Sequence, residues 1–268
     1  MQQAVILARG LGTRMRKDDA SAHLAPEQAA VADSGVKAMI PIDRPFLDYV
    51  LTALADVGYR RVCLIIGPEH QVVRDYYKQL SPKRLTIDFA VQSQPRGTAD
   101  AVAAAEASVG NEPFLVLNSD NYYPREALKM LRGADGSALA AFDRDAMLAG
   151  SNISADRLLK FAVVESDGAG AMKRIIEKPD AATLAALPLP LAVSMNCWRF
   201  TPVIFEACRK IAPSPRGELE ITDAVQYAID RLDERFQMIA CYAPVLDLSS
   251  RDDIATVTER LAGTEVNL

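Results

Sequence analysis

The chain has 268 residues, of which 50% are hydrophobic and 24% charged, and its 30 basic and 35 acidic side chains give a net charge of −5 at pH 7. This length suits one large domain, or two small ones that share a core, and the composition is typical of a globular protein. The acidic balance excludes a typical duplex-DNA binder, because such proteins cluster basic charge and here only residues 9–17 do so.

The first half alternates short apolar runs with helical patterns, which predicts parallel strands joined by covering helices. The expected strands are residues 4–8, 61–66, 85–92 and 114–118. The expected helices are residues 46–57, 70–80 and 98–109, with Thr98 as the cap of the last one. Residues 1–135 therefore read as a doubly wound βαβ layout.

The second half, residues 136–268, has a different pattern of elements. Expected strands lie at residues 137–142, 158–164, 172–177, 191–200 and 236–243, and expected helices at 181–187, 202–211, 221–232 and 251–261. No repeat or clear linker separates the halves, so we expect one domain over residues 1–268. Its fold class is α/β: a Rossmann-like, mixed, mainly parallel sheet with helices on both faces and a smaller β-rich lobe.

The amino-terminal apolar stretch is too short and too early for a secretory signal, and no run of about 18 apolar residues occurs. We therefore expect a cytoplasmic protein with no membrane partner. The four cysteines show no CxxC spacing and predict buried free thiols, and no zinc site is expected because His23 and His70 neighbour none of them.

A glycine-rich loop follows the first expected strand. Gly10 and Gly12 let the backbone approach a phosphate closely, and Arg14 adds positive charge. The loop lacks the third glycine of a dinucleotide fingerprint, since Met15 takes that place, and no GxxxxGK[ST] motif follows. By itself the pattern fits a phosphate-binding loop or a solvated strand exit.

Further segments accompany this loop in a fixed order. They are residues 7–14 (LARGLGTR), 37–41 (KAMIP), 92–99 (QSQPRGTA), Asp120 after a strand, 177–179 (EKP) and 217–223 (GELEITD). Together they span nearly the whole chain and resemble the sugar-1-phosphate nucleotidyltransferases, in particular the glucose-1-phosphate thymidylyltransferase and uridylyltransferase group. The resemblance implies a nucleotide-binding first half and a sugar-binding second lobe.

The implied reaction is attack by the oxygen of a hexose 1-phosphate on the α-phosphorus of a nucleoside triphosphate, giving an NDP-sugar and pyrophosphate. Two anions must meet, so such a site needs concentrated positive charge and a divalent metal. By resemblance Arg14 and Lys37 are the catalytic cations, on the β- and γ-phosphates and at the α-phosphate respectively. A surface arginine and a strand-edge lysine are the alternatives.

By resemblance Asp120 and Asp247 are the metal carboxylates, and their oxygen ligands suit Mg²⁺. Ser119 stands before Asp120 where the family usually has glycine. Serines replace the customary Gly-Thr after Asp247, so a simple aspartate near a helix start is the alternative for that residue.

The nucleotide-binding residues implied by the resemblance are Leu7, Ala8, Gly10, Gly12, Thr13, Gln92, Gly97 and Thr98. The amide of Gln92 would read the base edge, and Gly97 would leave room for the ring. A uracil or thymine edge suits glutamine, which favours UTP or dTTP, while the sequence leaves guanine and adenine open.

On the sugar side, Glu177 would bind hydroxyls, Lys178 the 1-phosphate, and Asn196 the sugar; exposed-turn charge and a core amide are the alternatives. Two departures from the family pattern stand out. Arg9 stands where the family usually has alanine or glycine. Residues 17–36 form a longer connection before Lys37 than is usual in the family, and this segment could be a lid, an oligomer contact or a disordered loop.

We therefore expect a Mg²⁺-dependent nucleotidyltransferase that acts on small molecules, with no nucleic acid partner. The length leaves no room for the β-helical tail of longer relatives, and the oligomeric state stays open, a homo-oligomer included. A non-catalytic sensor of nucleotide or sugar phosphate with the same fold is one alternative. A nucleotide-sugar-dependent glycosyltransferase is another, although residues 120–122 (DNY) lack the second aspartate of a DxD motif.

Overall fold

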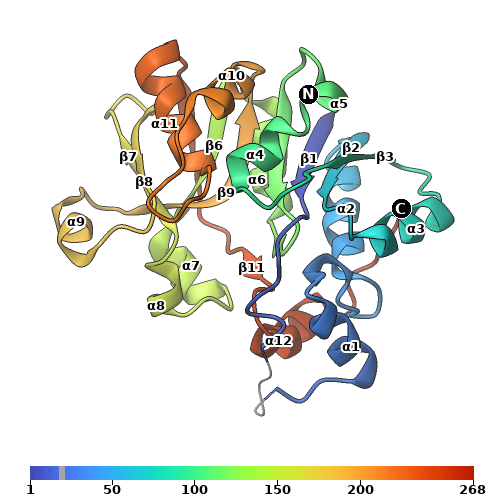
Figure 1. Cartoon of the computed structure of the whole chain (residues 1–268). Coiled ribbons are helices and arrows are strands. Elements are labelled where there is room, and N and C mark those ends of the chain that lie inside the picture. The colour runs from blue at the N-terminus through green and yellow to red at the C-terminus, as the bar shows by residue number, and fades with distance from the viewer. Residues whose placement is uncertain (18–21) are drawn as a thin grey trace.

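The structure is a computed structural model that describes residues 1–17 and 22–268, and a β-sheet runs through its centre (Figure 1). The strands are β1 (Gln3–Leu7), β2 (Arg61–Ile66), β3 (Thr86–Val91), β4 (Phe114–Asn118), β5 (Asn121–Tyr122), β6 (Ser137–Asp143), β7 (Ala162–Ser166), β8 (Met172–Ile176), β9 (Ala192–Phe200), β10 (Phe236–Cys241) and β11 (Leu246–Asp247). Within the described residues, nine of them form one sheet and β11 pairs with β5.

The main path of the sheet has the order β10, β6, β9, β4, β1, β2, β3, and β7 and β8 join it beside β9. Strands β4, β1, β2 and β3 pair in parallel, and β10 is parallel to β6. The antiparallel pairs in the described part of this sheet are those of β9 with β4, β6 and β7, and that of β7 with β8. The predicted mixed, mainly parallel α/β sheet is therefore confirmed.

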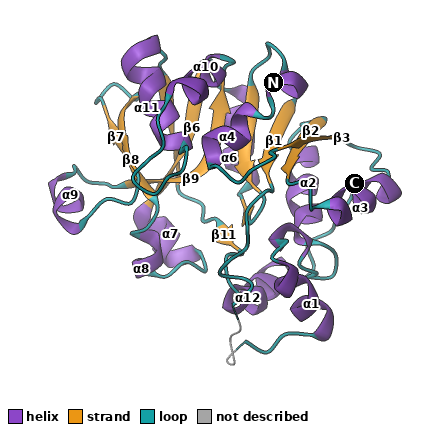
Figure 2. Cartoon of the chain, in the orientation of Figure 1, coloured by secondary structure: helices purple, strands orange, loops and turns teal. Residues whose placement is uncertain are grey.

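Helices cover both faces of the sheet (Figure 2). They are α1 (Pro26–Ser34), α2 (Phe46–Asp56), α3 (Gln71–Leu80), α4 (Thr98–Ala103), α5 (Glu106–Val109), α6 (Arg125–Gly133), α7 (Arg144–Gly150), α8 (Ala155–Leu158), α9 (Ala181–Ala186), α10 (Val203–Lys210), α11 (Ile221–Leu232) and α12 (Arg251–Leu261), with a 3₁₀ turn, η1 (Lys37–Met39). Successive strand side chains point to opposite faces, so Ile6 belongs to the core formed with α2, α6 and α12, while Val5 belongs to the core formed with α4, α10 and α11.

Two elements differ from their predictions. Residues 158–164 are not one strand: Leu158 ends α8, and β7 begins at Ala162. The helix expected at 98–109 is split into α4 and α5, and Thr98 does not cap it, because Gly97 is the N-cap and Thr98 is the first helical residue. The hydroxyl of Thr98 instead accepts a hydrogen bond from the distant Ile221 N–H, at 2.9 Å.

Four of the described helices were not expected from the sequence: α1, α6, α7 and α8. Helix α1 lies inside the long connection at residues 17–36, begins at Pro26 and ends at Gly35 in the left-handed conformation. A disordered loop is therefore wrong for residues 26–34, while residues 18–21 lie outside the described residues.

Helix α12 returns to the first half of the chain, beside α1 (Figure 1). Arg251 donates from Nε to the Met15 carbonyl at 3.0 Å and pairs through Nη2 with Asp33. In the parts of the chain that the structure describes, each helix falls short of the length and apolarity that crossing a membrane requires.

Candidate functional site

A cleft of about 470 Å³ opens at the carboxyl ends of β1 and β4, the edge where α/β folds collect ligand groups. Its lining holds all eight predicted nucleotide residues: Leu7, Ala8, Gly10, Gly12, Thr13, Gln92, Gly97 and Thr98. Four residues predicted for other roles also line it: Arg14, Lys37, Asp120 and Asn196. Glu177, Lys178 and Asp247 are not on that lining.

The glycine loop packs tightly against the end of α1. Gly12 has φ +61°, and a Cβ there would lie 2.2 Å from the Gly35 carbonyl oxygen, so only glycine fits. Arg16 donates from Nη2 to the Ser34 carbonyl at 2.7 Å and ties the two segments together. Arg14 is exposed in the cleft and has no ion-pair partner within residues 1–17 and 22–268, which leaves its guanidinium available to an anion.

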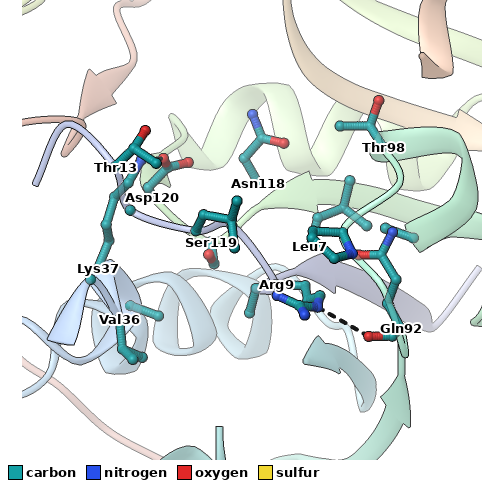
Figure 3. Close-up of a pocket in the computed structure, with 18 of the residues that line it drawn as sticks. Leu7, Arg9, Thr13, Val36, Lys37, Gln92, Thr98, Asn118, Ser119 and Asp120 are labelled. Carbon is teal, nitrogen blue, oxygen red and sulfur yellow. Dashed lines mark hydrogen bonds and ion pairs between the residues drawn. The ribbon is translucent and has the colours of Figure 1, made fainter. Parts of the chain in front are cut away.

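Lys37 and Asp120 meet in the cleft (Figure 3). Lys37 opens η1 and Asp120 follows β4, and Lys37 Nζ lies 2.6 Å from Asp120 Oδ2. Their side chains are 14% and 22% exposed, so both groups are partly desolvated yet reachable from the cleft. Such a pair supplies one cation and one carboxylate at the same point, as handling a phosphate and a metal requires.

Asp247 lies behind Asp120 and is 2% exposed. Its Oδ1 accepts a hydrogen bond from Asn121 Nδ2 at 2.9 Å, and its Oδ2 pairs with Arg157. Burial, and then the neighbouring Asp120 carboxylate, raise the pKa of Asp247 above its ordinary value. The two predicted metal carboxylates are thus close enough to repel one another.

The carboxylates of Asp120 and Asp247 suit Mg²⁺ only as part of a larger set of oxygen ligands. No group of three or more metal-ligating side chains occurs in the described part of the chain. Mg²⁺ keeps several waters and is commonly held by one or two carboxylates plus substrate phosphates. Asp120 at the cleft, with Asp247 beside it, meets that requirement only when a phosphate supplies further oxygens.

Gln92, buried to 4% exposure after β3, faces the opposite end of the cleft. Its Nε2 donates to the Gly97 carbonyl at 3.0 Å and to Asp100 Oδ2 at 2.8 Å. Both side-chain N–H groups are thus used within the protein, and the amide oxygen is left for a ligand.

Arg9 is buried and lies beside Gln92, to which a dashed line joins it in Figure 3. Its Nε donates to the Gln92 carbonyl at 3.0 Å, and its Nη1 pairs with Glu69 at 2.8 Å. The residue that departs from the family pattern therefore fastens the glycine loop to the segment that carries Gln92.

The segment after Gln92 is joined to the start of α11. Leu219 N–H donates to the Arg96 carbonyl at 2.7 Å, and Ala99 N–H donates to the Leu219 carbonyl at 2.8 Å. Gly97, with φ +120°, packs so closely that a Cβ would lie 2.4 Å from the Leu219 carbonyl oxygen. With the Thr98 to Ile221 bond, these contacts form a junction between residues 96–99 and 219–221.

Two of the three predicted sugar residues have a left-handed backbone. Lys178 and Asn196 adopt positive φ values of 44° and 53°, a conformation that is uncommon for lysine and that asparagine adopts more readily. Asn196 reaches the cleft lining, and its Oδ1 accepts from Trp198 Nε1 at 3.3 Å. Lys178 is exposed.

Glu177 lies among other acids near α11. Burial, and then Glu220, raise the pKa of Glu177, while Arg216, 3.5 Å away, lowers it. A carboxylate that is partly desolvated and surrounded by acids is suited to accept hydrogen bonds from neutral hydroxyls.

Sequence reasoning missed several polar residues at the site. Asn118, Ser119 and Glu218 line the cleft, and Asn121 and Arg157 hold Asp247. Asn121 follows Asp120 directly, so its position next to a predicted ligand was a usable signal. Arg157 has no local signal, because it is 90 residues away from its partner Asp247.

Comparison with known proteins gives consistent results. A glucose-1-phosphate thymidylyltransferase of Streptomyces antibioticus is 32% identical over 230 residues, which cover 85% of this chain and 57% of that protein. The UTP–glucose-1-phosphate uridylyltransferase AglF of Haloferax volcanii is 27% identical over 229 residues, which cover 85% of this chain and 83% of that protein. The low-salt glycan biosynthesis nucleotidyltransferase Agl11 of that organism is 27% identical over 236 residues, with 85% and 59% covered.

The chain thus spans less than two thirds of the length of two of these three relatives. A crystal structure of a UDP-glucose pyrophosphorylase complexed with UDP-glucose matches 99% of this chain with a TM-score of 0.73 at 21% identity, which shows the same fold. The sequence profile described as nucleotidyl transferase matches residues 3–243, a span that holds the glycine loop, Lys37 and Asp120. These matches confirm the predicted family, and the protein belongs to the nucleotidyl transferases.

Proposed function

We propose that the protein couples a nucleoside triphosphate to a hexose 1-phosphate and releases pyrophosphate. The observation that carries the proposal is the cleft itself, which is lined by the glycine loop, by the Lys37–Asp120 pair and, at the opposite end, by Gln92 with its free amide oxygen. Phosphates, a metal and a base each find a chemically suitable group there. The similar thymidylyltransferase and uridylyltransferase support the same reaction.

Positioning and charge neutralisation would supply the rate, without a covalent intermediate. Arg14, exposed in the cleft, is placed to bind the β- and γ-phosphates of the leaving group. Lys37 would move from Asp120 to the α-phosphate, where negative charge develops. Mg²⁺, when bound through Asp120, would add Lewis-acid neutralisation of the phosphates.

The base preference follows from the hydrogen bonds of Gln92. Because both side-chain N–H groups are held by Gly97 and Asp100, the amide presents an acceptor to the base. The ring N–H of uracil or thymine is a matching donor, so we propose UTP or dTTP as the nucleotide.

The hexose would lie toward Asn196 and Glu177. Asn196 lies on the cleft lining with a left-handed backbone, and Glu177 offers a carboxylate for hydroxyl groups. Lys178 would contribute its ammonium to the 1-phosphate. We place the reaction in the cytoplasm, where nucleoside triphosphates and sugar phosphates meet.

The test is pyrophosphate release by the purified protein with Mg²⁺, using four or five triphosphates against glucose 1-phosphate and mannose 1-phosphate. We expect release with UTP or dTTP and one of the hexose phosphates, and the NDP-sugar as the second product. Nucleotide binding without release in any combination would contradict the proposal and favour a sensor. Release of free nucleoside diphosphate from an NDP-sugar and an acceptor would favour a glycosyltransferase.

A further inference from the structure

Arg157 holds two carboxylates behind the cleft. It is the third residue of α8, and its side chain is 25% exposed. Its Nη1 donates to Asp253 Oδ1 at 2.6 Å, and its Nη2 donates to Asp253 Oδ2 at 3.2 Å and to Asp247 Oδ2. One guanidinium therefore serves both acids.

The rest of Asp247 is fixed as well. Asn121 Nδ2 donates to Oδ1 at 2.9 Å, which leaves each carboxylate oxygen with a protein donor. Asn152 accepts from the Asp247 backbone N–H at 2.8 Å and donates to its carbonyl at 2.7 Å. Asp247 therefore has a fixed backbone and a fixed side chain.

Each of the two acids expected to bind metal has its own protein cation. Asp120 pairs with Lys37, and Asp247 pairs with Arg157. Together with Asp253, which shares Arg157, the three acids and two cations have a formal net charge of −1, whereas the three carboxylates alone would carry −3. A divalent cation is attracted far more strongly by the second arrangement than by the first.

We propose that Arg157 is a positioning residue that occupies Asp247 and so prevents the protein alone from binding a divalent metal tightly, until nucleotide phosphates bring the missing oxygen ligands. The metal then enters together with the nucleotide. This inference rests on the proposed function only in taking Asp120 and Asp247 as the metal carboxylates.

The test measures metal binding directly, without turnover. Mn²⁺ is titrated into the nucleotide-free protein, and the free ion is followed by electron paramagnetic resonance. We expect millimolar or weaker binding by the wild type and a dissociation constant at least about tenfold lower in Arg157→Gln, because one opposing charge beside Asp247 is gone. Arg209→Gln, which removes an exposed arginine paired with Glu106, is the matched control and should bind like the wild type.

Two more variants separate positioning from folding and from bulk charge. Arg157→Lys keeps the charge and should retain weak binding. The double variant Arg157→Gln, Asp253→Asn removes one positive and one negative charge, so the net charge stays the same and no buried acid at position 253 loses its partner. It still removes the partner of Asp247, so this variant should also bind Mn²⁺ more tightly than the wild type. Folding of each variant is checked by circular dichroism.

Micromolar binding of Mn²⁺ by the nucleotide-free wild type would overturn the inference by itself, whether or not a variant folds. A folded Arg157→Gln protein that binds no more tightly than the wild type would also overturn it. The pyrophosphate assay tests the proposed function separately. If the wild type is active and Arg157→Gln binds Mn²⁺ with the same affinity as the wild type, only this inference is refuted. An inactive wild type with tightened Mn²⁺ binding in the variant refutes only the proposed function.

Discussion

The residues that we propose for the nucleotide (the nucleotide side) and those that we propose for the sugar (the sugar side) are held by different means. Gln92, Lys37 and Asp120 each have a defined hydrogen-bond or ion-pair partner within 3.0 Å. Lys178 and Asn196 are instead held by a backbone in the left-handed region, and Glu177 lies among acids that raise its pKa. The nucleotide side is thus organised by close pairing, whereas the sugar side has longer contacts of 3.3 and 3.5 Å, a left-handed backbone and clustered negative charge.

The largest expected effect comes from breaking the pairing on the nucleotide side. Asp120→Ala and Lys37→Ala should each lower turnover by about 10²-fold or more, because preorganised charge at the reacting phosphates is lost. Pyrophosphate release under saturating substrates is the measurement. Lys129→Ala, on an exposed position of α6, is the control, and near-normal turnover of either cleft variant would refute the role of that residue.

The next effect concerns the junction of residues 96–99 and 219–221, which links the two sides. Gly97→Ala forces a Cβ against the Leu219 carbonyl oxygen at φ +120°, so we expect a loss of about 1–3 kcal/mol in unfolding free energy and weaker nucleotide binding. Denaturant titration and nucleotide calorimetry measure the two quantities. Gly110→Ala is matched, since Gly110 also has positive φ but open space around it, and equal nucleotide affinities in the two variants would contradict the close-approach argument.

A smaller effect should follow from removing one bond of that junction. Thr98→Val leaves the Ile221 N–H without its acceptor and should cost about 1–3 kcal/mol of stability, while Thr98→Ser should retain most of it. If the junction couples the sides, the Val variant also raises the KM for the hexose 1-phosphate. An unchanged KM would show that the two sides act independently.

The smallest effect is a shift in pH dependence on the sugar side. Arg216 lowers the pKa of Glu177, which burial and Glu220 raise, so Arg216→Gln should raise that pKa further. The acidic limb of kcat/KM for the hexose 1-phosphate should therefore move to higher pH, because Glu177 is protonated sooner as the pH falls. A limb that stays in place, measured against the wild type with the same substrate, would exclude Glu177 from sugar binding.

Most of the fold was predictable because its strands are buried apolar runs. Residues 61–66 and 114–118 were assigned without error, since parallel strands covered on both faces read as continuous hydrophobic segments. Short helices were harder to predict from the sequence. Helix α7 buries only Met147, and so small an apolar face leaves no readable period.

The candidate site was predictable only where a motif lies on one stretch of chain. The glycine loop, Lys37 and Asp120 followed from their segments, and the structure brings them into one cleft. The tie between Thr98 and Ile221 joins residues 123 positions apart, and local rules for helix caps contain no information about such a partner. The same holds for Arg157 and Asp247.

The bonds that Arg251 makes to Met15 and Asp33 have a consequence for biosynthesis. The glycine loop is among the first segments to leave the ribosome, yet Met15 and Asp33 receive their bonds from α12, made more than two hundred residues later. Domains fold as units while the chain is made at a finite rate. A nascent chain that already carries the whole glycine loop therefore still lacks the bonds from Arg251 to Met15 and Asp33, which form only after α12 has emerged.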